Sequence, residues 1–309
     1  MLREIDISVC VLTYNPKWNK LIETIDSILI QEDINYEIVI SDDGSKEFFF
    51  DELVEYFKSK NFENYKLVPA KENQGTVLNV KKAIDNSKGV YIKLISPGDM
   101  LYKSDALFRW CKALKDSRSK WSFAKAIFYN DEAGVRKAIA AKACPQIIET
   151  YLSGDEKKSR WNSVVNMDLV LGAAIICDKE LMSKYINRIA GKVIFAEDNI
   201  YRMMLFDGEM PCFYCENTIL YEYGSGISTS ANAVWAKRLL KDLAAANNEL
   251  AVAEKDYDAY QLKMLKAAAI IARQGGLFVK LNKCFVPGFL KLAFMDLIKY
   301  RKTDIVENI

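Results

Sequence analysis

Histidine is absent from this chain of 309 residues, and its absence excludes several kinds of catalytic site. A Ser-His-Asp triad, a Cys-His dyad and a histidine-ligated zinc site all need the imidazole ring. A general base that works near neutral pH is therefore expected to be a carboxylate, with lysine, cysteine and tyrosine as less favoured alternatives. Aspartate and glutamate are accordingly the first residues to consider for catalysis.

A large net charge, disulfide spacing and long apolar runs are also missing. The formal net charge is +2, which gives no general attraction to nucleic acid. The seven cysteines are an odd number without framework spacing, so we expect reduced thiols and interpret Cys212 and Cys215 as small core residues. No stretch is long enough to span a bilayer and no signal core follows the N-terminus, so we expect a cytoplasmic protein.

Alternating strands and helices organise the first hundred residues. Apolar, β-branched runs predict buried strands, and helical spacing of apolar residues between them predicts helices. Strands are expected over residues 5–12, 36–40, 65–68 and 90–95, and helices over 21–29 and 48–57 and after 73–76. This order predicts an α/β fold with a mainly parallel sheet and helices on both faces.

Beyond residue 100 the pattern is less regular. It predicts helices over residues 106–114, 179–189 and 198–206, strands over 121–128 and 213–221, and a polar stretch between them up to residue 166. Residues 231–271 are rich in Ala, Leu and Lys and indicate long helices. We therefore divide the chain into a sheet domain, residues 1–225, and a C-terminal helical region, residues 226–309, that packs onto it.

Three short fragments each follow an apolar run. They are CVLTYN at residues 10–15, SDDGS at 41–45 and SPGD at 96–99. Open α/β sheets bind ligands in the crevice beyond the carboxyl ends of their strands. Carboxylates in that crevice suit a metal ion and a nucleotide diphosphate.

The order of the motifs resembles that of the inverting family 2 glycosyltransferases with the GT-A fold, which is Rossmann-like. The matching pieces are VLTYN at 11–15, SDDGS at 41–45, ENQG at 72–75, SPGD at 96–99, LGA at 171–173 and ED at 197–198. The resemblance covers roughly the first 225 residues. It implies an enzyme of the hexosyltransferase class that moves a sugar from a nucleotide-sugar donor, a UDP-sugar, to a glycan or lipid-linked glycan acceptor in cell-surface polysaccharide synthesis.

The resemblance places nucleotide-binding residues after the first strands. Tyr14 would stack on the base, and Asp43 would accept a hydrogen bond from the N–H of uracil. The other nucleotide-binding positions that it implies are Thr13, Asn15, Asn73 and Gly75. Without the resemblance, Tyr14 is an ordinary turn residue, and residues 41–45 are a turn and helix cap that Asp42 shapes.

Residues 96–99 occupy the place of the family's D-x-D metal motif but depart from it. Ser96 and Gly98 replace the leading acids, so Asp99 is left as the metal ligand that the resemblance implies. Because a diphosphate and water supply further oxygen ligands, one carboxylate suffices for Mn²⁺ or Mg²⁺. The alternative is a Pro-Gly turn with a solvated aspartate.

Glu197 and Asp198 begin an expected helix, where the resemblance places the catalytic carboxylates. Asp198 is implied as the general base that takes the proton of the acceptor hydroxyl, and Glu197 as the group that orients the acceptor or the sugar. The transition state would resemble an oxocarbenium ion. The alternative is a pair of acids that stabilises the first turn of a helix.

Two further segments have open interpretations. Residues 221–228 lie where many relatives carry a histidine-containing loop over the diphosphate, so Tyr223 or Ser228 takes that function or the segment is a simple turn. Residues 277–302 mix aromatic and basic side chains. Such a segment suits an anionic membrane surface, which would make the protein peripheral at the inner face of the cell membrane, or a helix that packs on its own domain.

Two other functions compete with glycosyl transfer. A nucleotidyltransferase of similar sheet architecture is disfavoured because no Gly-rich loop with Arg or Lys follows the first strand. A catalytically silent nucleotide- or glycan-binding protein is the alternative that the reduced D-x-D motif suggests. Fold alone does not separate these functions.

Overall fold

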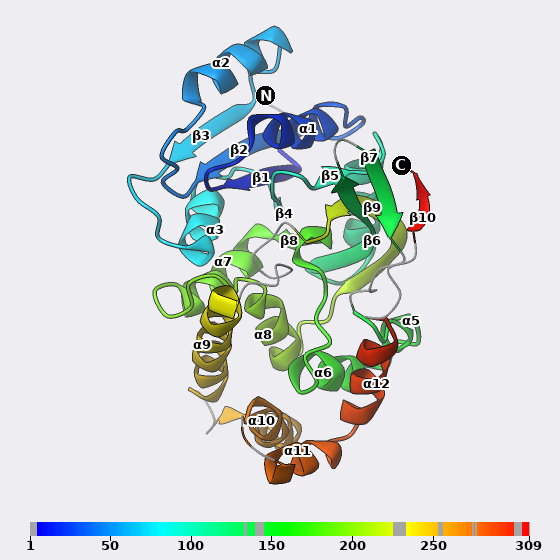
Figure 1. Ribbon diagram of the computed structural model, residues 1–309. Helices are drawn as coiled ribbons and strands as arrows, with labels where there is room; N and C mark the ends of the chain where they lie inside the picture. Colours follow the sequence, from blue (N-terminus) through cyan, green and yellow to red (C-terminus); the bar gives the residue numbers. More distant parts are fainter. Residues whose placement is uncertain are drawn as a thin grey trace.

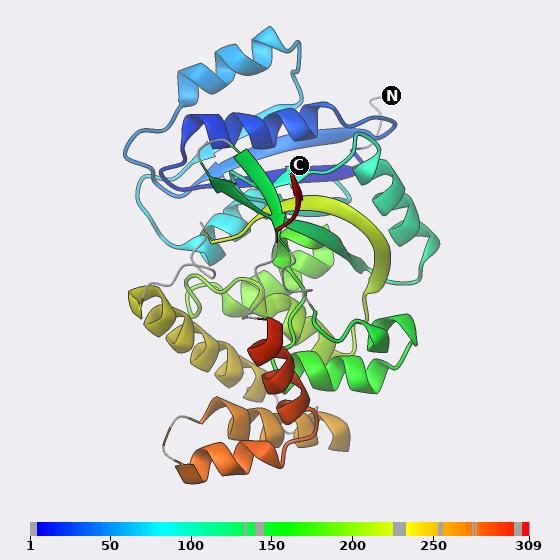
Figure 2. The same ribbon diagram turned by 45° about the vertical axis from the view of Figure 1, so that its right-hand side comes forward.

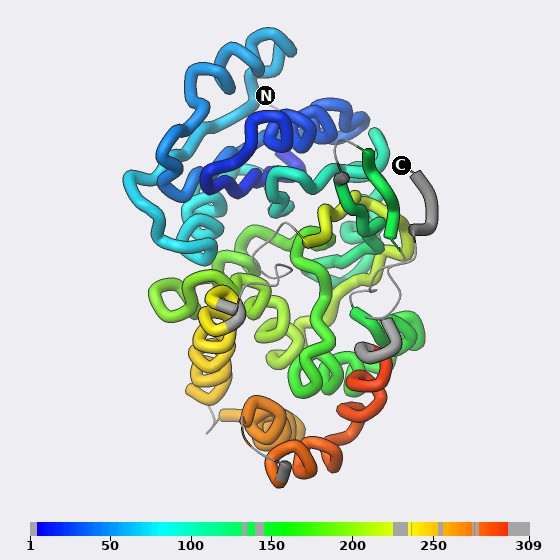
Figure 3. Tube along the Cα trace, viewed as in Figure 1, coloured from blue at the N-terminus to red at the C-terminus, as the bar shows by residue number. Residues whose placement is uncertain are grey.

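The computed structural model describes residues 5–132, 135–139, 145–224, 233–252, 256–273, 275, 277–299 and 305–308. A twisted sheet with helices on its faces occupies the upper part of the molecule in Figure 1, and a group of helices extends below it. Figure 2 shows the same arrangement after rotation. The Cα trace in Figure 3 runs from the blue N-terminal strands through the green middle segment to the orange helices at the opposite end.

Four parallel strands form the N-terminal half of the sheet, as the sequence predicts. They are β1 (Ile7–Thr13), β2 (Tyr36–Asp42), β3 (Tyr65–Pro69) and β4 (Tyr91–Ile95), in the order β4-β1-β2-β3. The helices between them are α1 (Trp18–Leu29), α2 (Phe50–Ser59) and α3 (Thr76–Asp85). Thr13 pairs with Asp42 and Val11 with Ile95, so β1, β2 and β4 end along one edge of the sheet.

Strand β1 is buried because its side chains alternate between two apolar cores. Val9 and Val11 lie in one core with Leu21 of α1, whereas Cys10 lies in the other with Val77 of α3. A shift of one residue would exchange these faces, so burial on both sides fixes the register of the strand. The loop that follows β1 is thereby held at the edge of the sheet.

The C-terminal half of the sheet is mixed, and it adds antiparallel strand pairs to the parallel sheet that the sequence predicts. Five of the nine strand pairs in the described ranges are antiparallel. The elements of this half are β5 (Met100–Leu101), α4 (Ala106–Asp116), β6 (Trp121–Glu132), β7 (Val135–Ile139), α5 (Glu149–Leu152), α6 (Glu156–Val164), the 3₁₀ turn η1 (Gly172–Ala174), β8 (Ile175–Asp178), α7 (Lys179–Ile189), α8 (Asn199–Asp207), β9 (Cys212–Glu222) and β10 (Ile305–Asn308). Two residues separate β6 from β7, and so short a connection joins only antiparallel strands.

Strand β9 corrects one expectation. Cys212 is half-buried but Cys215 is exposed, so the interpretation of both as core residues is wrong for Cys215. The six cysteines in the described parts of the chain are free thiols, as expected.

The C-terminal helices pack against the body of the molecule. They are α9 (Ala233–Ala251), α10 (Ala259–Ala272), α11 (Leu277–Cys284) and α12 (Phe289–Lys299). Ala246 and Leu250 of α9 and Met264 of α10 lie in the same buried cluster as residues of α3 and α7. The boundary between residues 225 and 226 stays a prediction. No helix within the described residues combines the length and the apolar character that a membrane span requires.

Candidate active site

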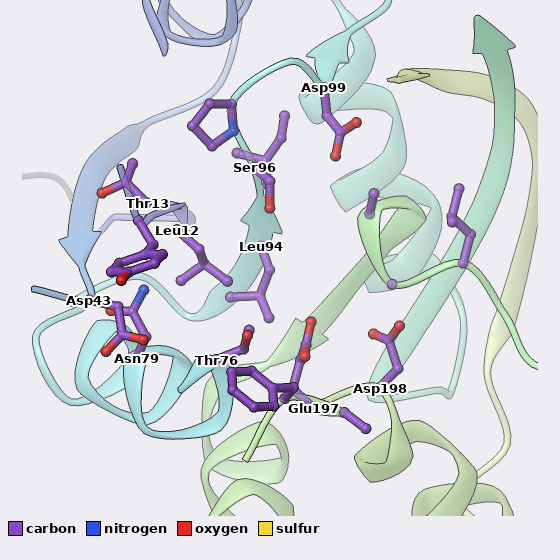
Figure 4. A pocket seen from close by; sticks show the side chains of 18 of the residues that line it. Leu12, Thr13, Asp43, Thr76, Asn79, Leu94, Ser96, Asp99, Glu197 and Asp198 are labelled. Atoms are coloured by element: carbon purple, nitrogen blue, oxygen red, sulfur yellow. The ribbon is translucent and has the colours of Figure 1, made fainter. Parts of the chain in front are cut away.

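A cavity of about 940 Å³ opens at the carboxyl-terminal edge of β1 and β4. Its walls come from the ends of β1, β4 and β9, from η1, from the segment before α8, and from α9. In Figure 4, carboxylates face the cavity from separate walls: Asp43 from the left, Asp99 from the top, and Glu197 and Asp198 from below. The volume is in the range of small-molecule sites, and the edge of the sheet is where such folds bind ligands.

Asp42 closes the turn after β2, as the sequence predicts. Its Oδ1 accepts hydrogen bonds from Thr13 Oγ1 at 2.8 Å and from Ser45 Oγ at 2.5 Å, and its Oδ2 accepts from the Ser45 N–H at 2.8 Å. Thr13 lines the cavity, but its hydroxyl is used inside the protein and its side chain is buried. These bonds fix the ends of β1 and β2 relative to each other.

Asp43 is buried at the cavity wall and holds the loop before α3. Its Oδ1 accepts the Gln74 N–H and its Oδ2 accepts the Gly75 N–H, both at 2.9 Å. Gly75 has a φ of +94°, and a Cβ there would lie 2.4 Å from Ile194 Cγ2. Glycine is therefore required for this loop to approach the wall so closely.

The two expected positions in the loop before α3 do not reach the cavity. Asn73 is exposed and Gly75 lies behind the wall, whereas Thr76 and Asn79 of α3 line the cavity. Asn79 is buried, and its Oδ1 accepts from Ser41 Oγ at 2.7 Å. Asn79 is a polar residue on the otherwise apolar face of α3, and sequence analysis missed this signal.

Tyr14 and Asn15 lie at the cavity rim and differ in what their side chains contact. Tyr14 is 53% exposed and lines the cavity, so part of its side chain is accessible to a ligand. Asn15 adopts a φ of +45°; its N–H donates to Ser45 Oγ at 2.6 Å, and its Oδ1 accepts the Lys46 N–H at 3.0 Å. Asn15 therefore shapes the loop that presents Tyr14.

Asp99 is buried on the wall opposite Glu197 and Asp198 (Figure 4). Its Oδ1 accepts the Glu222 N–H at 3.1 Å. Burial raises the pKa of Asp99 to about 7, although this hydrogen bond and the nearby Lys93 act in the opposite direction. Lys93 is itself fully buried, and burial lowers its pKa to about 7.

Lys93 joins two walls of the cavity from behind. Its Nζ donates to the carbonyl oxygen of Leu94, at 2.6 Å, and to that of Ala173. Leu94 belongs to β4 and Ala173 to η1, so the lysine holds the turn of η1 against the strand that precedes Asp99. Buried polar groups are stabilised by such satisfied contacts.

Asp198 lies directly over η1. A Cβ at Gly172 would fall 2.0 Å from Asp198 Oδ1, so only glycine leaves room for this carboxylate. Burial raises the pKa of Asp198 to about 6. Burial and the adjacent charge of Asp198 raise the pKa of Glu197 well above its ordinary value. The side chain of Asp198 caps no backbone N–H of α8, so helix capping does not account for its position.

A helix beyond the motif region holds the segment that precedes Glu197 and Asp198. Asp242 of α9 is buried, and its carboxylate accepts the backbone N–H groups of Ile194, Phe195 and Ala196 at 3.2, 2.6 and 3.0 Å. Sequence analysis missed this role, because nothing in the sequence indicates that residue 242 packs beside residue 195.

Lys20 and Glu222 are two further charged residues of the cavity that sequence analysis did not assign. Lys20 Nζ lies 2.5 Å from Asp131 Oδ2 and 3.4 Å from Glu222 Oε1. These contacts join α1 to β6 and β9. Lys20 thus places a positive charge in a wall that otherwise carries carboxylates.

The donor set of the cavity fits a cation that is shared with a ligand. Within the described ranges, no three acidic, cysteine or histidine side chains gather into a site made by protein alone. Asp99 and Glu222 do bring two carboxylates to one end of the cavity, and a diphosphate would complete their oxygen ligands. Ser228, named as a substitute for the family's histidine loop, lies outside the described residues, whereas Tyr223 is described and half-buried.

Comparisons with known proteins agree with this geometry. Residues 8–152 match the model of glycosyl transferase family 2. Proteins of Rickettsia felis and Rickettsia conorii, each named an uncharacterized glycosyltransferase, are 28% identical over 155 residues, which cover 48% of this chain and 25% of theirs. The match thus spans about a quarter of the length of these curated relatives.

Solved structures share the fold at low sequence identity. S. aureus TarS 1-349 in complex with UDP-GlcNAc superposes with a TM-score of 0.58 at 16% identity, covering 96% of this chain and 78% of that one. The mannosyltransferase PcManGT of Pyrobaculum calidifontis, in complex with GDP-Man and Mn²⁺, gives a TM-score of 0.57 at 17% identity, covering 97% and 83%. The expected GT-A fold is therefore confirmed.

The family match includes the cavity-lining residues between Leu12 and Asp99. The similarity of fold extends over almost the whole chain. The relatives that match in sequence are named glycosyltransferases. By family match and fold, the chain has the GT-A architecture, and its residues 8–152 match glycosyl transferase family 2.

Proposed function

We propose that this protein is a glycosyltransferase that moves a sugar from a UDP-sugar to a hydroxyl group of a glycan or lipid-linked glycan, with inversion at the anomeric carbon, in cell-surface polysaccharide synthesis. One observation carries the proposal: Asp198 presents a poorly solvated carboxylate to the cavity, opposite the wall formed by Asp99 (Figure 4). A base and a donor site on opposite walls are what displacement with inversion needs.

Asp198 is the general base in this proposal. Its carboxylate takes the proton of the acceptor hydroxyl while that oxygen forms a bond to the anomeric carbon. The bond from that carbon to the diphosphate oxygen breaks on the opposite side, and UDP leaves with the electron pair. Glu197, whose pKa is raised by burial and by the adjacent charge of Asp198, orients the sugar or the acceptor through a hydrogen bond.

Tyr14 and Asp43 bind the nucleotide in this proposal. The exposed ring of Tyr14 stacks on the base, and Asp43 accepts the N–H of uracil. Each oxygen of Asp43 accepts one backbone N–H, and a carboxylate oxygen has a second lone pair for the ligand. Thr13, Asn15 and Gly75 support these two residues from the loops behind them.

We further propose that Asp99 helps to hold Mn²⁺ or Mg²⁺ beside the diphosphate. Such an ion offsets the charge that develops on the departing phosphate oxygens. A mannosyltransferase of the same fold is bound to Mn²⁺ together with GDP-Man, which supports the presence of a cation.

In this proposal the protein meets its lipid-linked acceptor at a membrane surface. Phe278 of α11, Phe285 directly after it and Phe294 of α12 are 76%, 85% and 63% exposed. Lys280 and Lys291 are exposed on the same two helices. Apolar rings flanked by lysines suit an anionic membrane surface, where lipid-linked acceptors lie.

A nucleotide and donor panel tests the proposal. Calorimetry on the full chain with Mn²⁺ should show binding of UDP that exceeds binding of GDP and CDP, and UDP-glucose, UDP-galactose or UDP-GlcNAc should release UDP slowly to water. Equal affinity for the three diphosphates would contradict the uridine assignment. UDP binding without turnover of any donor or acceptor would favour the catalytically silent alternative.

A further inference from the structure

The turn after β4 lacks a side chain at the position where the family's metal motif has an acid. That position is Gly98, whose φ is +105°. A Cβ built on Gly98 would lie 2.1 Å from Glu222 Oε2, which is far inside van der Waals contact. The space of a side chain at position 98 is therefore filled by the carboxylate of Glu222.

Two hydrogen bonds fix Glu222 at this turn. The Glu222 N–H donates to Asp99 Oδ1 at 3.1 Å. Tyr129, which is paired with Glu222 between β6 and β9, donates its hydroxyl to the carbonyl oxygen of Gly98. The end of β9 is thus held against the turn, and the Glu222 side chain lines the cavity.

The surrounding charges leave one carboxylate oxygen of Glu222 free of the ion pair. Lys20 Nζ approaches Oε1 at 3.4 Å but lies closer to Asp131 Oδ2, at 2.5 Å. Oε2 is the atom that points toward Gly98. Asp99, in contrast, already uses Oδ1 to accept the Glu222 N–H.

We propose that Glu222 supplies the protein carboxylate for the divalent cation, in place of the acid that is absent at position 98. This inference rests on the proposed use of a nucleotide diphosphate donor. Asp99 then acts through its bond to the Glu222 backbone and as a second oxygen donor. When the diphosphate binds, Lys20 contacts its oxygens in place of Glu222. Lys20 stays at the same position because it remains paired with Asp131. A cation with two diphosphate oxygens, water and these carboxylates has a complete set of oxygen ligands.

Direct measurement of Mn²⁺ binding tests this role without an activity assay. The electron paramagnetic resonance signal of free Mn²⁺ is titrated with the full chain, with and without UDP, for the unaltered protein, Glu222→Gln and Glu216→Gln. We expect Glu222→Gln to weaken Mn²⁺ binding about tenfold or more in the presence of UDP. Glu216→Gln, which removes an exposed carboxylate of the same strand outside the cavity, should leave Mn²⁺ binding unchanged.

Lys20→Met gives an independent readout if Glu222→Gln fails to fold. Removal of the competing ammonium should strengthen Mn²⁺ binding in the absence of UDP. Unchanged Mn²⁺ affinity in Glu222→Gln, or in Lys20→Met, would overturn the inference. UDP binding is measured separately by calorimetry, so a protein that binds UDP without Glu222-dependent Mn²⁺ refutes this inference alone, whereas a protein that binds no UDP refutes the proposed function.

Discussion

Asp198 combines low solvation with access to the cavity. Burial holds its pKa near 6, about two units above the ordinary value of an aspartate. A carboxylate with such a pKa is ionised at neutral pH and is a stronger base than a solvated one. Glycine at position 172 and the Asp242 anchor of the preceding segment keep this carboxylate in place.

The pH dependence of turnover follows from the ionisation of Asp198. Because the base must be deprotonated, UDP release from the UDP-sugar that reacts best should rise with pH and level off above about pH 6 to 7. A pH–rate profile between pH 5 and 8.5, corrected for UDP affinity at each pH, measures this. A rate that is flat from pH 5 upward would show that no group with this pKa limits the reaction.

The same raised pKa predicts how pH affects stability. The folded chain binds the proton of Asp198 more tightly than the unfolded chain does, so this carboxyl lowers stability as pH rises through about 6. Asp198→Asn should therefore raise the free energy of unfolding at pH 8, on the order of 1–2 kcal/mol, with a smaller gain at pH 5. Urea unfolding at the two pH values measures the difference, and an equal or opposite effect would argue against a destabilising ionised Asp198.

Tyr14 offers a test of base stacking. Tyr14→Ala should weaken UDP binding by about 1–3 kcal/mol, because stacking on an aromatic ring contributes roughly that much per base. Tyr14→Phe should bind UDP almost as well as the unaltered protein. Tyr102→Ala removes another exposed tyrosine, outside the cavity, and should not change affinity in the same calorimetric titration.

At the residue scale, sequence analysis found the residues that lie next to recognisable turns. Tyr14, Asp43 and Asp99 line the cavity because parallel strands bring their carboxyl ends to one edge. Glu197 and Asp198 line it from the segment before α8. The residues that it did not assign come from elsewhere: Lys20 from a helix face, Glu222 from the end of β9, and Asp242 from α9. Their positions depend on tertiary packing, which leaves no local pattern in the sequence.

Among the elements, η1 carries the most specific steric requirement of the site. Its first residue, Gly172, faces Asp198, and its second, Ala173, accepts a hydrogen bond from the buried Lys93. The backbone of Gly172 and the carboxylate of Asp198 are therefore in contact without an intervening side chain.

Gly172→Ala tests this contact. The added methyl group would lie 2.0 Å from Asp198 Oδ1 and must displace the carboxylate. We expect UDP release to fall about tenfold or more, since displacements near 1 Å have effects of this order, while UDP affinity stays the same. Ala173→Gly changes the flexibility of η1 without adding an atom near Asp198 and serves as control. Normal turnover in Gly172→Ala would show that Asp198 has room to move and is not held by η1.

The elements of the parallel half were predictable because each has a strong periodicity. Strands β1 to β4 alternate with α1 to α3 almost within the expected bounds, and continuous apolar runs bury β1, β2 and β4 on both faces. Strand β7 and helices α5 and α6 lie in the stretch that reads as polar. Helix α6 buries Ser159 and Ser163, so its buried face has no apolar stripe to recognise.

For the whole molecule, the C-terminal helices combine a structural role with an exposed apolar surface. Helix α9 anchors the segment before Asp198 through Asp242. Phe278 of α11 and Phe294 of α12 are exposed, and both helices belong to the lower part of the molecule in Figure 1. Exposed rings of this kind are unfavourable in water unless a partner covers them.

Vesicle binding tests the proposed membrane surface. Phe278→Ser combined with Phe285→Ser should lower co-sedimentation with vesicles of phosphatidylglycerol and phosphatidylcholine, because the rings enter the interface. Leu152→Ser combined with Val252→Ser alters exposed apolar residues elsewhere and should leave co-sedimentation unchanged. Equal sedimentation of both variants and the unaltered protein would contradict a role of α11.

The most direct test of the whole account compares Asp198→Asn with the unaltered chain in two assays, UDP release from the UDP-sugar panel and calorimetric UDP binding. The amide keeps the shape of the side chain but cannot accept the proton, so turnover should fall about 10²- to 10⁴-fold while UDP affinity is retained. Asp51→Asn, an exposed residue of α2, should behave like the unaltered protein in both. Near-normal turnover in Asp198→Asn, or an equal loss of UDP binding, would contradict the assignment of Asp198 as the base.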